Sequence, residues 1–249
     1  MKRLNWQILF ASSLIVLSVI FYLIHYAIFR DVHHIFIYLI GDIAFVFLEV
    51  LLVTLIIHQL LSKRERRAML KKLNMVIGAF FSEVGTVLLR YFSNFAHHAD
   101  RIQNDLIITN DWSEKKFLEV KKGLRKHDLG VESRKGDLED LRSFLLAKRN
   151  FLLGLLENPN LLEHDSFTNL LWAVFHLTEE LAHRTAVSHL PDADYDHLSV
   201  DMKRVYGLLI SEWLDYMKHL RTNYPYLFSL ALRTNPFDPN ASPEIKETP

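Results

Sequence analysis

The chain has 249 residues, half of them hydrophobic, and its 29 basic and 29 acidic side chains give a formal net charge of zero. A chain without a basic excess is poorly suited to phosphate backbones, which argues against nucleic acid as the main partner. The absence of cysteine excludes disulfides, thiol catalysis and cysteine-ligated clusters, and fits a reducing compartment.

Two apolar runs near the N-terminus, residues 4–29 and 35–61, are each longer than the roughly 20 residues that cross a bilayer. The first run is also too long for the apolar core of a signal peptide. The short segment between the runs, residues 30–34, leaves room for a tight turn and makes the two helices antiparallel neighbours. The sequence therefore predicts an antiparallel transmembrane hairpin in residues 1–62.

Basic residues near the ends of the runs predict the orientation of this hairpin. Lys2 and Arg3 precede the first run, and the turn carries Arg30, offset by Asp31. A basic cluster follows the second run: Lys63, Arg64, Arg66, Arg67, Lys71 and Lys72. Because Lys and Arg collect on the cytoplasmic side, we expect an integral protein of the plasma (inner) membrane with both termini in the cytoplasm. The cluster can also attract anionic lipid, at about 1 kcal/mol per base.

Ionisable residues interrupt the apolar runs. Asp42 and Glu49 share one face of the second helix, about 10 Å apart along its axis. His25, in the first run, can reach the depth of Asp42. Such residues face protein or water and are functional candidates. We expect them to bind cations, relay protons or pair with another subunit; the alternative is a structural role, as protonated acids bonded to a neighbouring helix.

Residues 63–234 are predicted to form a cytoplasmic helical domain, because glycine is scarce and no long β-branched alternation occurs. The second span is expected to continue into a cytoplasmic helix with apolar residues at the spacing of a coiled coil or bundle seam. This seam contains Leu70, Leu73, Ile77, Phe80, Val84, Val87 and Tyr91. Packing inside one subunit and packing across a dimer both explain it.

Later helices are expected to begin at caps near Asp111, Asp137 and Ser166, with a long helix over residues 198–223 and a short one over 226–232. Four of the seven prolines fall between Pro236 and Pro249, which predicts a disordered tail from residue 235 to residue 249. Within that tail, Asn235-Pro236-Phe237 favours a turn from which Phe237 packs back onto the domain.

His176, Glu180 and His183 form the most metal-like group in the sequence. Glu180 and His183 have the Glu-x-x-His spacing of carboxylate-bridged di-iron bundles, but those bundles need a second such motif, and the sequence has none. The apolar stripe of the same helix points away from both histidines. A solvated helix face is therefore the preferred interpretation, and no cofactor is predicted.

The sequence contains no glycine-rich phosphate loop, nucleophile elbow or His-Glu-x-x-His zinc motif, so an enzyme is not favoured. The all-α plan of membrane hairpin and cytoplasmic bundle predicts a membrane-anchored interaction protein with a scaffold or signalling role. Its expected partners are the lipid bilayer, further copies of the chain and an unidentified protein. The alternative is an oligomeric ion channel or transport subunit that uses Asp42 and Glu49.

Overall fold

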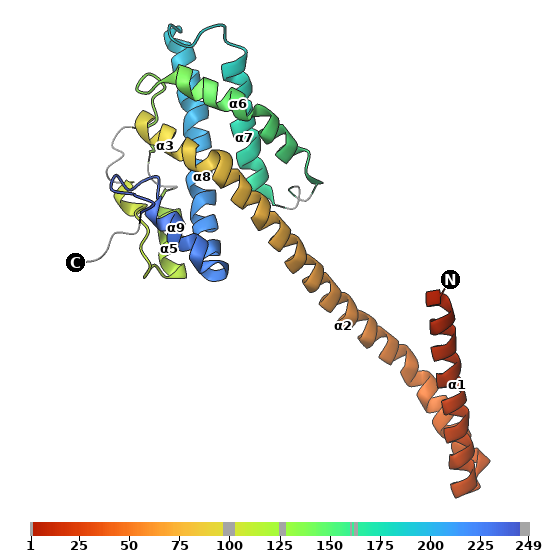
Figure 1. Cartoon of the computed structure of the whole chain (residues 1–249). Helices are drawn as coiled ribbons and strands as arrows, with labels where there is room; N and C mark the ends of the chain where they lie inside the picture. Colours follow the sequence, from red (N-terminus) through yellow and green to blue (C-terminus); the bar gives the residue numbers. More distant parts are fainter. Residues whose placement is uncertain (1, 97–102, 125–127, 160, 162–163, 245–249) are drawn as a thin grey trace. The chain divides into compact units, whose positions relative to one another are not determined.

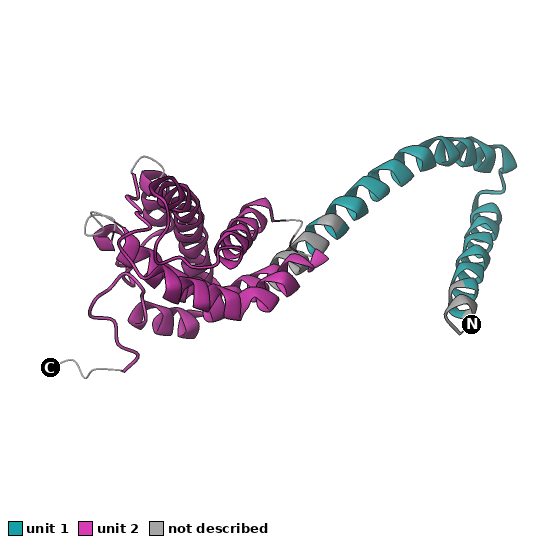
Figure 2. Ribbon diagram, turned by 90° about the horizontal axis from the view of Figure 1, so that it is seen from above, with its two compact units in different colours: residues 1–67 teal, residues 68–249 magenta. Residues whose placement is uncertain are grey.

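The computed structural model describes residues 2–96, 103–124, 128–159, 161 and 164–244. Throughout this part of the chain the regular structure is helical, apart from an isolated β-bridge between Ala96 and Val131, so the all-α prediction is confirmed. The chain divides into two compact units, Met1–Arg67 and Ala68–Pro249, coloured separately in Figure 2. The sequence places this division slightly earlier, after residue 62.

Unit 1 is a hairpin of helix α1 (Lys2–Phe29) and the first part of helix α2 (Val32–Phe80) (Figure 1). Arg30 has a φ of 47° and its N–H donates to the carbonyl of Tyr26, which ends α1. The Asp31 carboxylate accepts from the backbone N–H of His33 at 2.9 Å and so caps α2. The connection is therefore shorter than predicted, because α2 begins at Val32.

Both helices of unit 1 are long and apolar enough to cross a membrane. The stretches Ile8–Phe29 and Val32–Leu61 have 22 and 30 residues and mean hydropathies of 2.3 and 2.5, and neither is buried within the protein. A third stretch, Leu73–Phe95, has a lower mean hydropathy of 1.4 and is 44% buried. That stretch lies in unit 2, where protein covers part of it.

Helix α2 continues through a π-helical turn, η1 (Phe81–Gly85), into helix α3 (Thr86–Phe95). Both the backbone N–H and the hydroxyl of Thr86 donate to the carbonyl of Phe81, five residues earlier, which is the bonding of a π turn. A Cβ at Gly85 would lie 2.5 Å from the Phe81 ring, so the turn needs glycine. Neighbouring residues are buried in pairs here, as with Leu88 and Leu89, which widens the apolar face.

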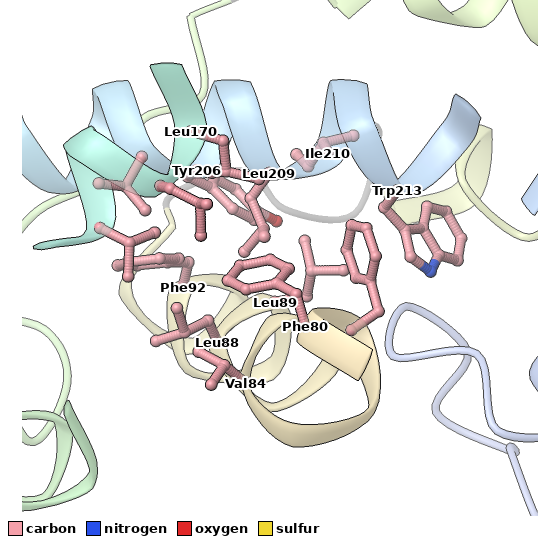
Figure 3. Close-up of a cluster of buried hydrophobic side chains, with 14 of the residues drawn as sticks. Phe80, Val84, Leu88, Leu89, Phe92, Leu170, Tyr206, Leu209, Ile210 and Trp213 are labelled. Atoms are coloured by element: carbon pink, nitrogen blue, oxygen red, sulfur yellow. The ribbon is translucent and has the colours of Figure 1, made fainter. Parts of the chain in front are cut away.

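This widened face forms the core of unit 2 with helices α7 (Asp165–Ala182) and α8 (Asp192–Asn223) (Figure 3). Residues from the two sides that meet in the core are Phe80, Val84, Leu88, Leu89 and Phe92 on one side, and Leu170, Tyr206, Leu209, Ile210 and Trp213 on the other. The Phe80 ring lies 5.3 Å from the Phe167 ring, edge to face. Much of the predicted seam is thus buried inside one chain.

The remaining helices complete unit 2 around α7 and α8. Helix α6 (Leu138–Leu156) packs on α7, while α5 (Glu114–Leu124) and α9 (Pro225–Arg233) pack on α8. The Asp137 carboxylate caps α6 by accepting from the N–H of Asp140, as predicted. The cap of α5 is Ser113 instead of Asp111, because its hydroxyl accepts from the N–H of Lys116.

Two further helix ends differ from the predictions. Helix α7 is capped by the His164 ring, which accepts from the N–H of Phe167, and not by Ser166. Helix α8 begins at Asp192, well before residue 198. The acidic residues of its first turn, Asp192 and Asp194, suit the positive end of a helix dipole, so the residues just before the predicted start are also helical.

The first residues after α9 are packed against unit 2. Asn235 and Phe237 are each 2% exposed, and the Phe237 ring lies 5.0 Å from the Trp213 ring. The Asn235 amide donates to the carbonyl of Leu106 at 3.0 Å and accepts from the N–H of Phe237 at 2.9 Å. The expectation of a disordered tail from residue 235 is therefore wrong for residues 235–237, where Phe237 packs back onto the domain; residues 245–249 lie outside the described part.

Phe80→Ala should destabilise unit 2 by about 3–5 kcal/mol, because it removes a buried ring that contacts two others and leaves a cavity. Met75→Ala, on an exposed position of the same helix, should change the free energy of unfolding by less than about 0.5 kcal/mol. Urea unfolding of the full chain in detergent micelles, followed by tryptophan fluorescence, measures both. Equal effects would contradict the proposed core.

Asn235→Ala should cost about 2–3 kcal/mol, since it removes two hydrogen bonds and leaves a buried carbonyl and a buried N–H without partners. Phe237→Ala should cost about 3–5 kcal/mol. Asn240→Ala, the same substitution as the first at an exposed position, serves as the control in the same unfolding measurement. Three neutral variants would mean that this segment is not part of the core.

Candidate functional site

A cleft of about 820 Å³ lies between the two helices of unit 1, beside the turn that joins them. Its walls are largely apolar, from residues such as Ile24, Ile28 and Ile35. Six residues with polar groups also line it: Ser18, Tyr22 and His25 from α1, and His34, Tyr38 and Asp42 from α2. Polar groups gathered in an otherwise apolar cleft are the usual makeup of a ligand site.

Aromatic rings form a continuous series along one side of this cleft. The His25 ring lies 4.7 Å from the Phe29 ring and 6.0 Å from the His34 ring. The His34 ring in turn lies 4.7 Å from the Tyr38 ring. These centroid distances are those of ring pairs in contact, so the series joins the two helices through their side chains.

Asp42 and His25 both line this cleft. The His25 Nδ1 atom is buried and has no hydrogen-bond partner among the described residues. A buried imidazole nitrogen without a partner is costly and marks the place where a bound group can make a hydrogen bond.

Glu49 is not among the residues that line the cleft. Both carboxylates are exposed on α2, but only Asp42 lines the cleft, so the structure does not bring the two into one site within a single hairpin. An exposed carboxylate in an apolar helix needs cover from water or from another protein chain.

Sequence reasoning missed Tyr22, His34 and Tyr38, although the signal is present. In α2 the residues His34, Tyr38 and Asp42 recur at every fourth position, and in α1 the residues Ser18, Tyr22 and His25 recur at spacings of four and three. Each set therefore occupies one helix face. A search of each apolar run for polar residues at helical spacing, and not for charged residues alone, would have predicted the cleft.

The predicted basic cluster is described only in part. The side chains of Lys63 and Arg64 are exposed. The side chains of the other members, Arg66, Arg67, Lys71 and Lys72, lie outside the described residues. Their role toward anionic lipid stays a prediction.

A second polar group lies between α7 and α8, around the buried side chain of Asp201, which is 5% exposed. The Nε2 atoms of His176 and His197 lie 3.3 and 3.4 Å from its Oδ2 atom, which is buried and makes no well-formed hydrogen bond within the described part. Glu180 lies beside both histidines, at 3.8 and 3.7 Å. Sequence reasoning found His176 and Glu180 but missed their partners on α8.

Arg184 holds Glu180, one of the two carboxylates of this group. Arg184 donates to Glu180 at 2.8 Å and to Asp194 at 2.9 Å, which bridges the end of α7 to the start of α8. The hydrogen bond from Arg184 lowers the pKa of Glu180 below its ordinary value, against the opposing effect of burial. The group therefore works as an ionic link between the two helices.

His183 takes a different place from the one that a metal site requires. It follows α7 as the C-cap, and its Nδ1 atom lies 2.8 Å from the carbonyl oxygen of Glu179. Within the described ranges, no three or more His, Asp or Glu residues are arranged to hold a metal ion. The metal hypothesis for His176, Glu180 and His183 thus gains no support.

Comparisons with known proteins agree with the division into two units. Residues 2–61 match the model of the MJ1433 N-terminal helical domain, and residues 69–233 match that of the C-terminal helical domain of uncharacterized protein MJ1433. The protein of that name from Methanocaldococcus jannaschii is 47% identical over 247 residues, which cover 99% of each chain. No solved structure matches the chain. The chain therefore belongs to the MJ1433 family and contains both of its helical domains.

Proposed function

We propose that this protein is a membrane-anchored helical interaction protein, in which unit 1 is the anchor and unit 2 the interaction module of a scaffold or signalling system. The observation that carries the proposal is the contrast between the units. The apolar helices of unit 1 bury none of their candidate spanning stretches within the protein, whereas unit 2 encloses a core of its own.

The exposed surface of unit 1 is what a bilayer would cover. Large apolar side chains are exposed along both helices; Phe47, for example, is 75% exposed. Apolar patches of this extent are rare on soluble monomers, and burial in lipid stabilises each such side chain by about 1.5–3 kcal/mol. The basic residues on both flanks support an orientation with the termini in the cytoplasm.

Unit 2 offers a surface for a protein partner. Trp172 on α7 is 58% exposed, and its ring lies edge-on to the Phe175 ring. The Arg149 guanidinium lies over Phe175, 5.6 Å from the ring centroid. Tryptophan and arginine are both enriched among the residues that dominate binding energy at interfaces.

Single cysteines test the anchor, because the parent chain has none and gives no background labelling. In right-side-out vesicles, a membrane-impermeant maleimide should label His33→Cys, near the turn, and should label Ser143→Cys, exposed on α6, only after permeabilisation. Release of the parent by alkaline carbonate would contradict the anchor. Labelling of Ser143→Cys in intact vesicles would contradict the orientation.

The exposed Glu49 favours a second candidate, an oligomeric channel or transport subunit, because neighbouring chains would have to cover this carboxylate. Native mass spectrometry of the full chain released from detergent separates the two functions. We expect a dimer, since two hairpins are too few to enclose a pore. A closed assembly of four or more chains would favour the channel and overturn the interaction protein.

A further inference from the structure

The cleft of unit 1 is lined by a carboxyl group. Of the described residues that line it, none is Lys or Arg, and Asp42 is the one acidic side chain. A carboxylate in apolar surroundings is costly unless a cation accompanies it. The described residues that line the cleft include no lysine or arginine to pair with this carboxylate, so a bound cation can take that place.

The aromatic side chains of the cleft suit a positively charged group. Tyr22 and Tyr38 line the cleft together with Phe21 and Phe29, and the faces of such rings attract an ammonium group, most strongly when water is excluded. The two tyrosines come from opposite helices, so a group between the helices meets aromatic rings from both sides.

The His25 Nδ1 atom adds a hydrogen-bond requirement. In the tautomer that leaves this nitrogen unprotonated, Nδ1 is an acceptor, and the described residues offer it no donor. An ammonium group with N–H bonds can donate here while its charge is balanced by Asp42. A trimethylated ammonium has no such donor.

We propose that the cleft binds a primary ammonium group, carried by an amphiphile whose apolar chain lies along the isoleucines of the cleft wall. The proposal rests on the proposed function, because a lipid-borne amine reaches the cleft from the bilayer. Asp42 pairs with the charge, His25 accepts an N–H, and the tyrosine rings contact the remaining face of the ammonium group.

Isothermal titration calorimetry of the full chain in dodecyl maltoside micelles tests this with dodecylamine as the probe. The parent should bind dodecylamine at least tenfold more tightly than dodecanol, which has the same chain without the charge. Equal binding of the two compounds would overturn the proposal, and this comparison needs no variant.

Asp42→Asn should weaken dodecylamine binding at least tenfold. Glu49→Gln is the matched control, because it neutralises a second carboxylate of the same helix that does not line the cleft, and it should bind as the parent does. Equal losses in both variants, with unchanged helicity by circular dichroism, would overturn the site. Binding in micelles does not depend on how the protein is oriented in vesicles. Failure of the binding site can therefore be distinguished from failure of the membrane anchor, which cysteine labelling tests.

Ethylamine, which carries the same ammonium without a chain, distinguishes the source of the ligand. Weak binding of ethylamine supports a lipid-borne amine, whereas binding as tight as that of dodecylamine would overturn the amphiphile and leave a site for free amines.

Discussion

Burial of the apolar face that runs from Leu73 to Phe95 is the constraint on which unit 2 depends. This face carries several phenylalanines, and truncating each one costs about 3–5 kcal/mol, a large share of the stability of a typical domain. Helix α8 is long enough, at 32 residues, to cover the face and to present its other sides to α5, α7 and α9. The remaining helices of unit 2 are arranged around that pairing.

Unit 1 obeys the opposite rule, because its side chains point outward and are not covered by the protein. Two helices contact each other along a single interface and bury little of each other's apolar surface. The stability of the unit therefore depends on what covers the rest of that surface. Polar stripes on the facing sides, with Tyr22 in α1 and Tyr38 in α2, create a cleft where the hairpin would otherwise be uniformly apolar. The unit therefore combines an apolar exterior with a largely apolar cleft that carries a few polar groups.

The sequence predicted the all-helical class correctly, since scarce glycine and helical spacing of apolar residues indicate it, whereas the membrane hairpin stays a prediction. The sequence also predicted His25 and Asp42 because ionisable groups stand out in apolar runs, but not the tyrosines, which do not. His197 and Asp201 escaped prediction because they meet His176 only when α7 and α8 pack together. The start of α8 and the burial of Asn235 were also missed, because prolines and acidic residues favour turns locally and only tertiary contacts override that preference.

The π turn at Phe81–Gly85 has a mechanical consequence. A π turn holds one surplus residue in a helix, and each residue corresponds to about 100° of rotation about the axis. If the surplus residue migrated toward Val32, the residues it passed would twist by that angle while the helix stayed unbroken. Here the surplus residue is fixed in place by the Phe81 ring packed against Gly85, and by the two hydrogen bonds that Thr86 donates to the Phe81 carbonyl. A twist applied to α2 could therefore not be absorbed by moving the π turn along the helix, and would act on the core of unit 2.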